Sequence, residues 1–487
     1  MNKLALLLVV GMIFWMAACG SSAAPSVVTG VTPICLLTSG NIQSGQVLQC
    51  TASVTGTGPY ETTVTWMASA GTINSIGVFT APTVTSPQSV TITATSTQTT
   101  SVSGSTNVVV APVNLQSLVV DNGPQPQNFT TFNQAFVTVE VCVPGTQTCQ
   151  SIDHVLVDTG SSGLRLLSSV LTVPLPQQND SSGNPLDECH IFTDGYGWGP
   201  VSLADVSITG ELGPSTLVHV LIPSTSSPPV PASCSSQSMG SNEGDSVAAL
   251  GANGILGVGV FQQDCGATCT SSNGTIPPIY YDCPASGCNP TFVTLAQQVP
   301  NPVSMFMADN NGVLISLPTV PSQGLPNLTG SLIFGIGTQG NNALQSAVVY
   351  TVPSSGSNAG QITSIYSGTS YPAFINSGAD AFYFLDSATT SLTTCTVPPQ
   401  DLTWYCPTSL TNLTATNQGT NGNQGTVNFS IGNASTLLSS GNAALDTLGA
   451  PLPGEFDWGL PFFFNRVVFT AIENQSTPGG TGPYIAY

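Results

Sequence analysis

Short runs that alternate apolar and hydroxyl residues, separated by turn residues, recur along most of this chain. Examples are "TTVTWMASAG" at residues 62–71 and "SVTITATST" at residues 89–97. A period of two is typical of a β-strand with one buried face, and the chain's 50 Gly and 37 Pro supply the turns. One stretch, "PTFVTLAQQV" at 290–299, favours a helix instead. The pattern predicts an all-β fold.

Charged side chains are rare in this sequence. Only 5% of the 487 residues are Asp, Glu, Lys or Arg, compared with about 25% in ordinary soluble domains. The three basic residues, Lys3, Arg165 and Arg466, stand against 23 acidic residues and give a formal net charge of −20. This charge repels phosphate backbones and argues against nucleic-acid binding. A surface with few ion pairs also tolerates acid, which suits a secreted, low-pH setting.

The first nineteen residues, "MNKLALLLVVGMIFWMAAC", have the layout of a secretory signal: one Lys, an apolar core and small residues before a cysteine. The apolar core is shorter than the roughly 20 residues that a membrane span needs. Met16 to Cys19 resembles the lipobox of bacterial lipoproteins, which implies a signal peptide of residues 1–18 and a lipid on Cys19. The protein would then be exported and anchored to the bacterial outer membrane or cell surface. An ordinary signal peptide with cleavage nearby is the alternative.

Thirteen cysteines are present, and setting Cys19 aside leaves twelve, enough for six disulfides in an oxidising compartment. Many are close in sequence, which is typical of pinned hairpins and loops: Cys142 and Cys149, Cys265 and Cys269, Cys283 and Cys288, Cys395 and Cys406. The histidines, His154, His190 and His219, do not stand at zinc-ligand spacings from them. We therefore expect no metal site and no cofactor.

Strand-like runs separated by Gly and Pro turns fill residues 26–112 at the spacing of a β-sandwich. This stretch resembles the bacterial immunoglobulin-like modules, with Trp66 as the core aromatic and Cys35 to Cys50 as a plausible bridge. We expect residues 19–112 to form a lipid-anchored immunoglobulin-like sandwich. Because it contains no catalytic constellation, its expected role is that of a spacer.

One acid stands in the otherwise neutral stretch "VLVDTGSSGLRLL" at 155–167. Asp158 ends an apolar run and precedes the turn Thr159-Gly160-Ser161, whose amides and hydroxyls can hold a carboxylate ionised. A structural turn would explain the same four residues. The segments that follow decide between the two interpretations.

In order along the chain, these segments resemble those of the pepsin-like aspartic proteases. After the Asp-Thr-Gly-Ser motif, residues 194–210 resemble the flap hairpin, and residues 252–261 resemble the Gly-Ile-Leu-Gly segment beneath the active site. Residues 330–338 then resemble the last strand of the amino-terminal lobe, and residues 459–487 resemble the closing strands. In the closing strands Gly459-Leu460-Pro461 replaces the usual Leu-Gly-Asp. The resemblance implies a two-lobed β fold with lobes at 113–339 and 340–487. It also implies that Tyr196 is the flap tyrosine that folds over bound substrate.

Catalysis in this family needs two aspartates about 3 Å apart that share one proton. The ionised one takes a proton from the attacking water, and the neutral one donates to the oxyanion. The second lobe's match is "YPAFINSGADAFYFLD" at 371–386, in which Asn376 occupies the aspartate position. Because an amide cannot lose a proton, Asn376 argues against proteolysis. Asp380 as a replacement acid, or deamidation of Asn376, are alternatives.

Arg165 is the second departure from the family, because pepsins have a large aromatic residue near this position. The resemblance to the family implies that Arg165 lies near the base of the flap, where it could contact Tyr196 or reach a carboxylate. A structural cation that balances Asp158 or another buried acid is an equally good interpretation. The stretch "DTGSSGLRL" also resembles an uncharacterised bacterial branch of pepsin-like lipoproteins, for which no substrate is implied.

Two functions remain. The first is a cell-envelope lipoprotein whose aspartic-protease-like domain is catalytically impaired and binds peptides or a protein partner in its cleft. The second is an active acid endopeptidase that uses Asp158 with an unconventional partner. Esterase, metalloprotease and nucleotide-binding motifs are absent from the sequence.

Overall fold

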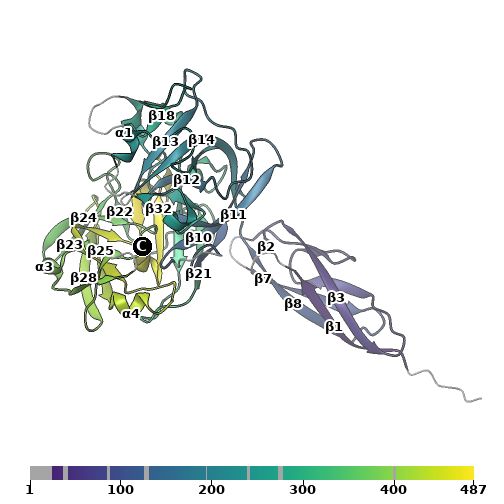
Figure 1. Ribbon diagram of the computed structural model, residues 1–487. Coiled ribbons are helices and arrows are strands. Elements are labelled where there is room, and N and C mark those ends of the chain that lie inside the picture. The colour runs from purple at the N-terminus through teal and green to yellow at the C-terminus, as the bar shows by residue number, and fades with distance from the viewer. Residues whose placement is uncertain are drawn as a thin grey trace, which may run out of the picture. The chain divides into compact units, whose positions relative to one another are not determined.

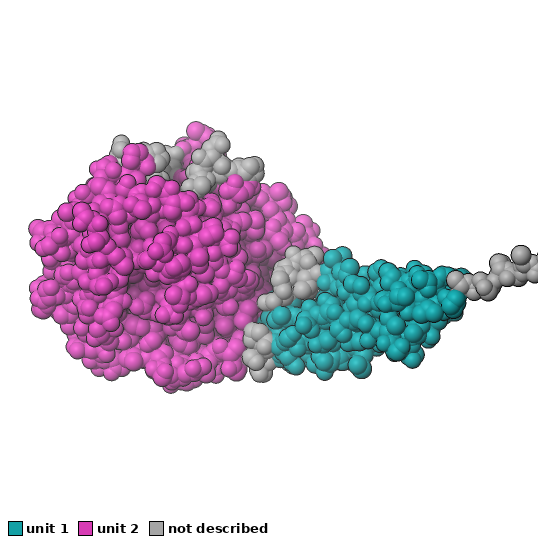
Figure 2. Space-filling view, turned by 90° about the horizontal axis from the view of Figure 1, so that it is seen from below, with its two compact units in different colours: residues 1–112 teal, residues 113–487 magenta. Residues whose placement is uncertain are grey.

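A computed structural model of the protein describes residues 25–36, 42–84, 88–125, 131–192, 195–237, 242–271, 278–398 and 402–487. The predicted signal peptide and Cys19 lie outside these residues. The chain forms two compact units, Met1–Pro112 and Val113–Tyr487, which are coloured separately in Figure 2. Within the described ranges, the structure contains no helix of the length and apolarity that crossing a membrane requires.

The first unit consists of two four-stranded sheets. One sheet contains, in spatial order, β1 (Val27–Cys35), β3 (Val47–Thr57), β6 (Val78–Thr80) and β5 (Thr72–Ile73). The other contains β2 (Ile42–Gln43), β8 (Ser103–Ala111), β7 (Gln88–Ser96) and β4 (Val64–Ala68). Alternate residues of these strands fill the core, including Phe79, Val90 and Ile92, and Trp66 packs partly buried against them. The immunoglobulin-like assignment of this unit stays a prediction.

The second unit is built on a sixteen-stranded sheet and a seven-stranded sheet. The large sheet runs β19 (Asn289–Thr291), β18 (Tyr280–Asp282), β13 (Leu186–Ile191), β14 (Gly195–Ile208), β15 (Glu211–Leu221), β12 (Ser162–Leu167), β17 (Gly254–Val258), β11 (Cys149–Asp158), β10 (Ala135–Cys142), β9 (Leu115–Val120), β21 (Leu328–Phe334), β20 (Gly312–Leu317), β32 (Arg466–Ala471), β35 (Tyr484–Ala486) and β22 (Val349–Thr351), with β16 (Asn242–Glu243) beside β14. The smaller sheet runs β29 (Gln424–Ile431), β28 (Thr411–Gln418), β23 (Ile362–Tyr366), β24 (Thr369–Ile375), β31 (Leu452–Trp458), β25 (Phe382–Leu385) and β30 (Gly449–Ala450). Two-strand ribbons complete the unit: β26 (Thr394–Val397) with β27 (Leu402–Tyr405), and β33 (Ser476–Thr477) with β34 (Gly480–Thr481).

Figure 1 shows how these sheets divide into two lobes. The strand β32, in yellow, lies between a lobe with β12, β13, β14 and β18 and a lobe with β23, β24, β25 and β28. Because β32 pairs with β20, the carboxy-terminal strands join the sheet of the amino-terminal lobe. The predicted two-lobed all-β fold is confirmed.

Helices are short throughout the described residues. The α-helices are α1 (Ala232–Ser235), α2 (Val247–Leu250), α3 (Ser387–Thr390) and α4 (Ala434–Leu438), and the 3₁₀ helices are η1 (Gly266–Thr270), η2 (Leu295–Gln297), η3 (Pro302–Met305) and η4 (Leu460–Phe463). The expected helix at 290–299 was wrong, because β19 takes its first residues and only η2 is helical. Prolines at both ends and the β-branched residues between them leave room for a single turn.

The two lobes repeat one strand arrangement. In the first lobe, β17 lies between β11, to which it is parallel, and β12, to which it is antiparallel. In the second lobe, β31 lies in the same way between β24 and β25. The loop that joins each outer pair must cross the end of the middle strand. These crossing loops contain Asp158 and Asn376.

Six disulfides join the twelve cysteines of the described residues, as the cysteine count predicted. The pairs are Cys35–Cys50, Cys142–Cys149, Cys189–Cys234, Cys265–Cys269, Cys283–Cys288 and Cys395–Cys406. Most close short loops or pin hairpins, such as the one between β10 and β11.

Candidate active site at the junction of the lobes

Thr159 and Ser377 hold the two crossing loops together through four reciprocal hydrogen bonds. The Thr159 hydroxyl donates to the carbonyl of Ile375 at 2.9 Å and accepts from the amide of Ser377 at 2.9 Å. In the opposite direction, the Ser377 hydroxyl donates to the carbonyl of Val157 at 2.7 Å and accepts from the amide of Thr159 at 3.1 Å. Both hydroxyl residues are buried. We call this set of contacts the interlock.

The interlock brings Asp158 and Asn376 face to face. A Cβ atom added to Gly160 would lie 2.6 Å from Asn376 Oδ1, and one added to Gly378 would lie 2.5 Å from Asp158 Oδ1. Each loop therefore needs glycine because the side chain of the other lobe occupies the adjacent space. The two residues that the sequence predicted as a pair are brought together across 218 positions of the chain.

The carboxylate of Asp158 receives two hydrogen bonds from its own loop. The amide of Gly160 donates to Oδ1 at 2.8 Å, and the Ser161 hydroxyl donates to Oδ2 at 2.5 Å. Oδ1 is the oxygen that faces Gly378, so the Ser161 contact lies on the outer side.

The orientation of the Asn376 amide follows from its two partners. The amide of Gly378 donates to Oδ1 at 3.0 Å, so the atom at that position must be an acceptor. The nitrogen, Nδ2, then lies on the outer side and donates to Asp457 Oδ2 at 3.1 Å. Asn376 thus turns its acceptor, Oδ1, toward the Asp158 loop. A protonated aspartic acid at position 376 would place a donor there.

Asp457 is an acid that the sequence analysis did not select. When Asn376 is matched with Asp158, β31 pairs with β24 in the same register in which β17 pairs with β11. Asp457 on β31 then corresponds to the apolar Ile255 on β17. Its Oδ1 is inaccessible to solvent and has no hydrogen-bond partner. Burial raises the pKa of Asp457 to about 7, although the hydrogen bond from Asn376 lowers it. This acid therefore carries a proton at acidic pH.

The two lobes differ at three corresponding positions. Where the first lobe has Asp158, Ser161 and Ile255, the second has Asn376, Ala379 and Asp457. A hydroxyl donor suits the outer oxygen of an aspartate, whereas the outer nitrogen of an asparagine requires an acceptor. Asp457 supplies that acceptor.

Asp380, the alternative acid of the sequence analysis, accepts a hydrogen bond from the Tyr383 hydroxyl at 2.6 Å. Its backbone carbonyl accepts from Asn133 Nδ2 at 2.7 Å. These contacts tie Asp380 to the start of β25, beyond the crossing loop.

Arg165 lies at the centre of a buried charge cluster in the amino-terminal lobe. Its Nη2 lies 3.0 Å from Glu188 Oε1, 3.1 Å from Asp264 Oδ2 and 2.7 Å from His190 Nδ1. The side chains of Arg165, Glu188 and Asp264 are fully inaccessible. The sequence left several partners open for Arg165. In the structure its partners are the buried acids Glu188 and Asp264.

Protonation in this cluster is set by burial and by the guanidinium. Burial raises the pKa of Asp264 well above its usual value. The pKa of Glu188 lies well below its usual value because the charges of His219 and Arg165 outweigh its burial. Glu188 is therefore the ionised partner of Arg165, and Asp264 holds a proton. Burial lowers the pKa of His219 to about 4.

His190 is the third residue that surrounds the Arg165 guanidinium. Its Nδ1 lies 2.7 Å from Arg165 Nη2 and 3.1 Å from Glu188 Oε1. Burial, and next the charge of Arg165, lower the pKa of His190, while the negative charge of Asp158 acts through space in the opposite direction. His190 lies on β13, which precedes the segment 194–210 that the sequence predicted as a flap hairpin. Most of that segment is the single strand β14, and it is β13 that pairs with it.

Tyr196 lies on β14, within that segment. Its side chain is 7% exposed and packs in a cluster with Trp198, Tyr281 and the Cys189–Cys234 disulfide. Residues 193–194 lie outside the described residues. A contact of Tyr196 with a ligand stays a prediction.

Two groups of side chains in the described residues have the ligand types of a metal site: Asp187, Cys283 and Cys288, and Glu188, His190 and Asp264. The two cysteines of the first group form a disulfide, which removes them as thiolate ligands. In the second group the Arg165 guanidinium already contacts all three residues, so a cation stands where a metal would bind.

Long-range partners are what the sequence analysis missed. Asp457, Glu188 and Asp264 come together with Asn376 or Arg165 over separations of 81, 23 and 99 residues. One sequence signal was available, since an acid inside an apolar run of a chain with so few charges is unusual. "EFDWGLPFF" around Asp457 is such a run.

The interlock predicts a large loss of stability on Thr159→Val, which leaves the buried carbonyl of Ile375 and the amide of Ser377 without partners. We expect the free energy of unfolding to fall by about 2–4 kcal/mol. Denaturant titration measures the change. Thr270→Val, which removes an exposed hydroxyl bonded to the Ala267 carbonyl, is the matched control and should cost less than about 1 kcal/mol. Equal losses in the two variants would contradict a special role for the interlock.

Removal of the buried cation should be similarly damaging. Arg165→Met leaves the buried Glu188 carboxylate without its cation, and we expect the free energy of unfolding to fall by about 3–5 kcal/mol. Adding Glu188→Gln to that variant should recover part of the loss because it removes the unpaired charge. The same denaturant titration decides, and an Arg165→Met protein as stable as the wild type would show that the cluster does not depend on its cation.

Comparison with solved structures finds similarity to an aspartic proteinase from Irpex lacteus, at 13% identity and a TM-score of 0.45, over 76% of this chain and 96% of that chain. At that TM-score, the fold rests on the contacts described above. None of the curated proteins matches this chain. A family model described as "Protein of unknown function (DUF3443)" matches residues 110–487. The chain therefore belongs to the DUF3443 family.

Proposed function

We propose that residues 113–487 bind an extended segment of peptide or protein beside Asp158 and Asn376, and that they hydrolyse it poorly or not at all. The observation that carries this proposal is the orientation of the Asn376 amide, with Oδ1 on the Gly378 amide and Nδ2 on Asp457. The geometry of an aspartic-protease-like site is retained, and the proton-sharing partner of Asp158 is replaced.

The retained groups suit binding. Asp158 remains an acceptor for a water molecule or a peptide N–H. One of the two Nδ2 hydrogens of Asn376 goes to Asp457, which leaves the other for a peptide carbonyl. Hydrolysis also requires a group that loses and regains a proton beside Asp158, and the amide does neither.

Asp457 favours a second candidate function, an acid endopeptidase that uses Asp158 with an unconventional partner. The pKa of Asp457, which burial raises to about 7, leaves it protonated at pH 3–5, and it contacts Asn376 directly. In this alternative Asp457 is the proton donor. Asp457→Asn should then abolish cleavage by the wild-type protein.

Exchange of the two side chains tests the proposed function. The double variant Asn376→Asp with Asp457→Asn keeps the hydrogen bond between the two positions and moves the carboxyl next to Asp158. We expect cleavage of an unfolded protein at pH 3–5 to rise by about 10²–10⁴, the contribution of a positioned acid or base. Its pH profile should be bell-shaped and belong to the pair of acids.

Three controls accompany the exchange. Asp158→Asn in the same background should abolish the new activity, and a statine-type inhibitor should block it. The wild-type protein should bind that inhibitor without cleaving the substrate. A well-folded exchange variant that cleaves nothing between pH 2 and pH 7, together with no inhibitor binding by the wild type, would exclude both a latent protease and a peptide-binding site.

We propose further that the protein is exported and anchored by a lipid on Cys19, with residues 19–112 as a spacer. This rests on the sequence of residues 1–19. Expressed in a bacterial host that processes lipoproteins, the wild-type protein should fractionate with membranes, and Cys19→Ser should release it because it removes the lipidated thiol. An equally membrane-bound Cys19→Ser protein would contradict the anchor.

A further inference from the structure

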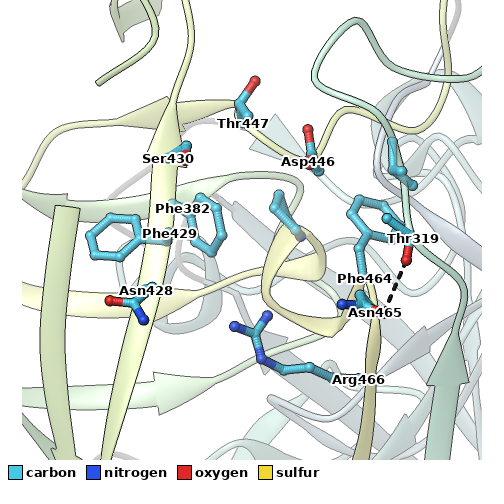
Figure 3. A pocket seen from close by; sticks show the side chains of 12 residues that line it. Thr319, Phe382, Asn428, Phe429, Ser430, Asp446, Thr447, Phe464, Asn465 and Arg466 are labelled. Carbon is cyan, nitrogen blue, oxygen red and sulfur yellow. Dashed lines mark hydrogen bonds between the residues drawn. The ribbon is translucent and has the colours of Figure 1, made fainter. Parts of the chain in front are cut away.

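A pocket of about 190 Å³ lies in the carboxy-terminal part of the second unit (Figure 3). It is lined by residues of β25 and β29 on one side and by the segment that leads into β32 on the other. None of the residues of the candidate active site lines it. Its walls combine three phenylalanines, Phe382, Phe429 and Phe464, with the polar side chains of Asn428, Asp446 and Arg466.

Arg466 is the ionisable cation of this pocket. Its guanidinium stacks 4.5 Å from the centre of the Phe462 ring, and Nη1 donates to the Phe462 carbonyl at 2.5 Å. In contrast to Arg165, it forms no ion pair with a carboxylate in the described part of the chain. Burial lowers the pKa of Arg466, and the neighbouring phenol of Tyr487 opposes that effect. A half-buried guanidinium without a counter-ion is unusual in a chain with 23 acidic residues.

A second donor faces the same space. The Oδ1 atom of Asn428 accepts from the Thr414 hydroxyl at 2.9 Å, which leaves its Nδ2 as a donor. In Figure 3 the exposed Asn428 and the guanidinium of Arg466 both lie below the rings of Phe382 and Phe429. Two donors, one of them charged, define a place for an acceptor with negative charge.

We propose that this pocket binds a small organic carboxylate, with the carboxylate between Arg466 and Asn428 and the remainder of the ligand over the phenylalanines. A planar guanidinium matches a carboxylate through two parallel hydrogen bonds. The volume limits the ligand, because an apolar cavity of about 150 Å³ is filled by one benzene molecule. The site therefore holds a group of the size of one amino-acid residue.

Asp446 restricts the charge of the ligand. It lines the same pocket, and burial raises its pKa to about 6. Together with Arg466 it makes up the ionisable part of the lining. When Asp446 is ionised it repels an anion, so a singly charged carboxylate is favoured over a doubly charged phosphate. Below pH 6 the acid is neutral and the repulsion is lost.

The carboxylate can come from a free acid or from the carboxy-terminus of a peptide. N-acetylalanine represents both, because it has the terminal carboxylate and one preceding amide. We expect calorimetric titration of the full chain to detect N-acetylalanine but neither its amide nor inorganic phosphate. A tetrapeptide that ends in a free carboxylate distinguishes the sources: tighter binding than N-acetylalanine favours a peptide end, and weaker binding favours a free acid.

Variants of the pocket separate binding from structural effects. Arg466→Gln should weaken N-acetylalanine binding at least about tenfold, the loss expected for a charge-assisted hydrogen-bond pair. Asp446→Asn should tighten it about two- to threefold at pH 7.5, the size of one screened charge interaction. The wild type should bind more tightly at pH 5 than at pH 7.5, because N-acetylalanine stays ionised at pH 5 while Asp446 is protonated. Asp446→Asn should abolish that pH dependence.

Several results would overturn the site: equal binding of the acid and its amide, stronger binding of phosphate, or unchanged affinity in Arg466→Gln. Should Arg466→Gln fail to fold, the opposite shift expected in Asp446→Asn and the acid-to-amide comparison still decide. Retention of the statine-type inhibitor by Arg466→Gln is a control for the lobe junction. The proposal therefore stands or falls separately from the function of Asp158 and Asn376.

Discussion

Four hydrogen bonds between Thr159 and Ser377 determine the geometry of everything around them. Each hydroxyl donates to the backbone that leads into the opposite loop and accepts from the opposite loop's own amide. A shift of one lobe against the other would break several of these buried bonds at once, so the relative position of the loops is well defined. Gly160 and Gly378 can then lie against the facing side chains. The pairing of Asp158 with Asn376 is a consequence of this contact.

Asn376 differs from Asp158, its counterpart in the first lobe, and its neighbours differ with it. Ala379 removes a possible donor from the outer side of position 376, and Asp457 brings an acceptor to it. The second lobe is therefore internally consistent as an asparagine site.

The fold was predictable from sequence to the extent that it depends on local pattern. Alternation in the strands, the Asp-Thr-Gly-Ser turn and the position of Asn376 are all read over a few neighbouring residues. The partners of Arg165 were not predictable, because Glu188 and Asp264 reach it only after β12 and β13 have been placed in the sheet. Asp457 was missed for the same reason. The helix expected at 290–299 failed because periodicity over ten residues could not outweigh the prolines at its ends and its pairing in β19.

The places taken by the two arginines have a consequence for the cleavage of the folded chain by proteases. Trypsin-like enzymes cut after Lys or Arg, and they act on segments that can be drawn out of the fold. Beyond Lys3, this sequence contains only Arg165 and Arg466 as such positions. Arg165 is fully inaccessible inside a strand, and Arg466 starts a strand with its side chain half-buried. Trypsin-like proteases should therefore cleave the folded chain slowly at Arg165 and Arg466.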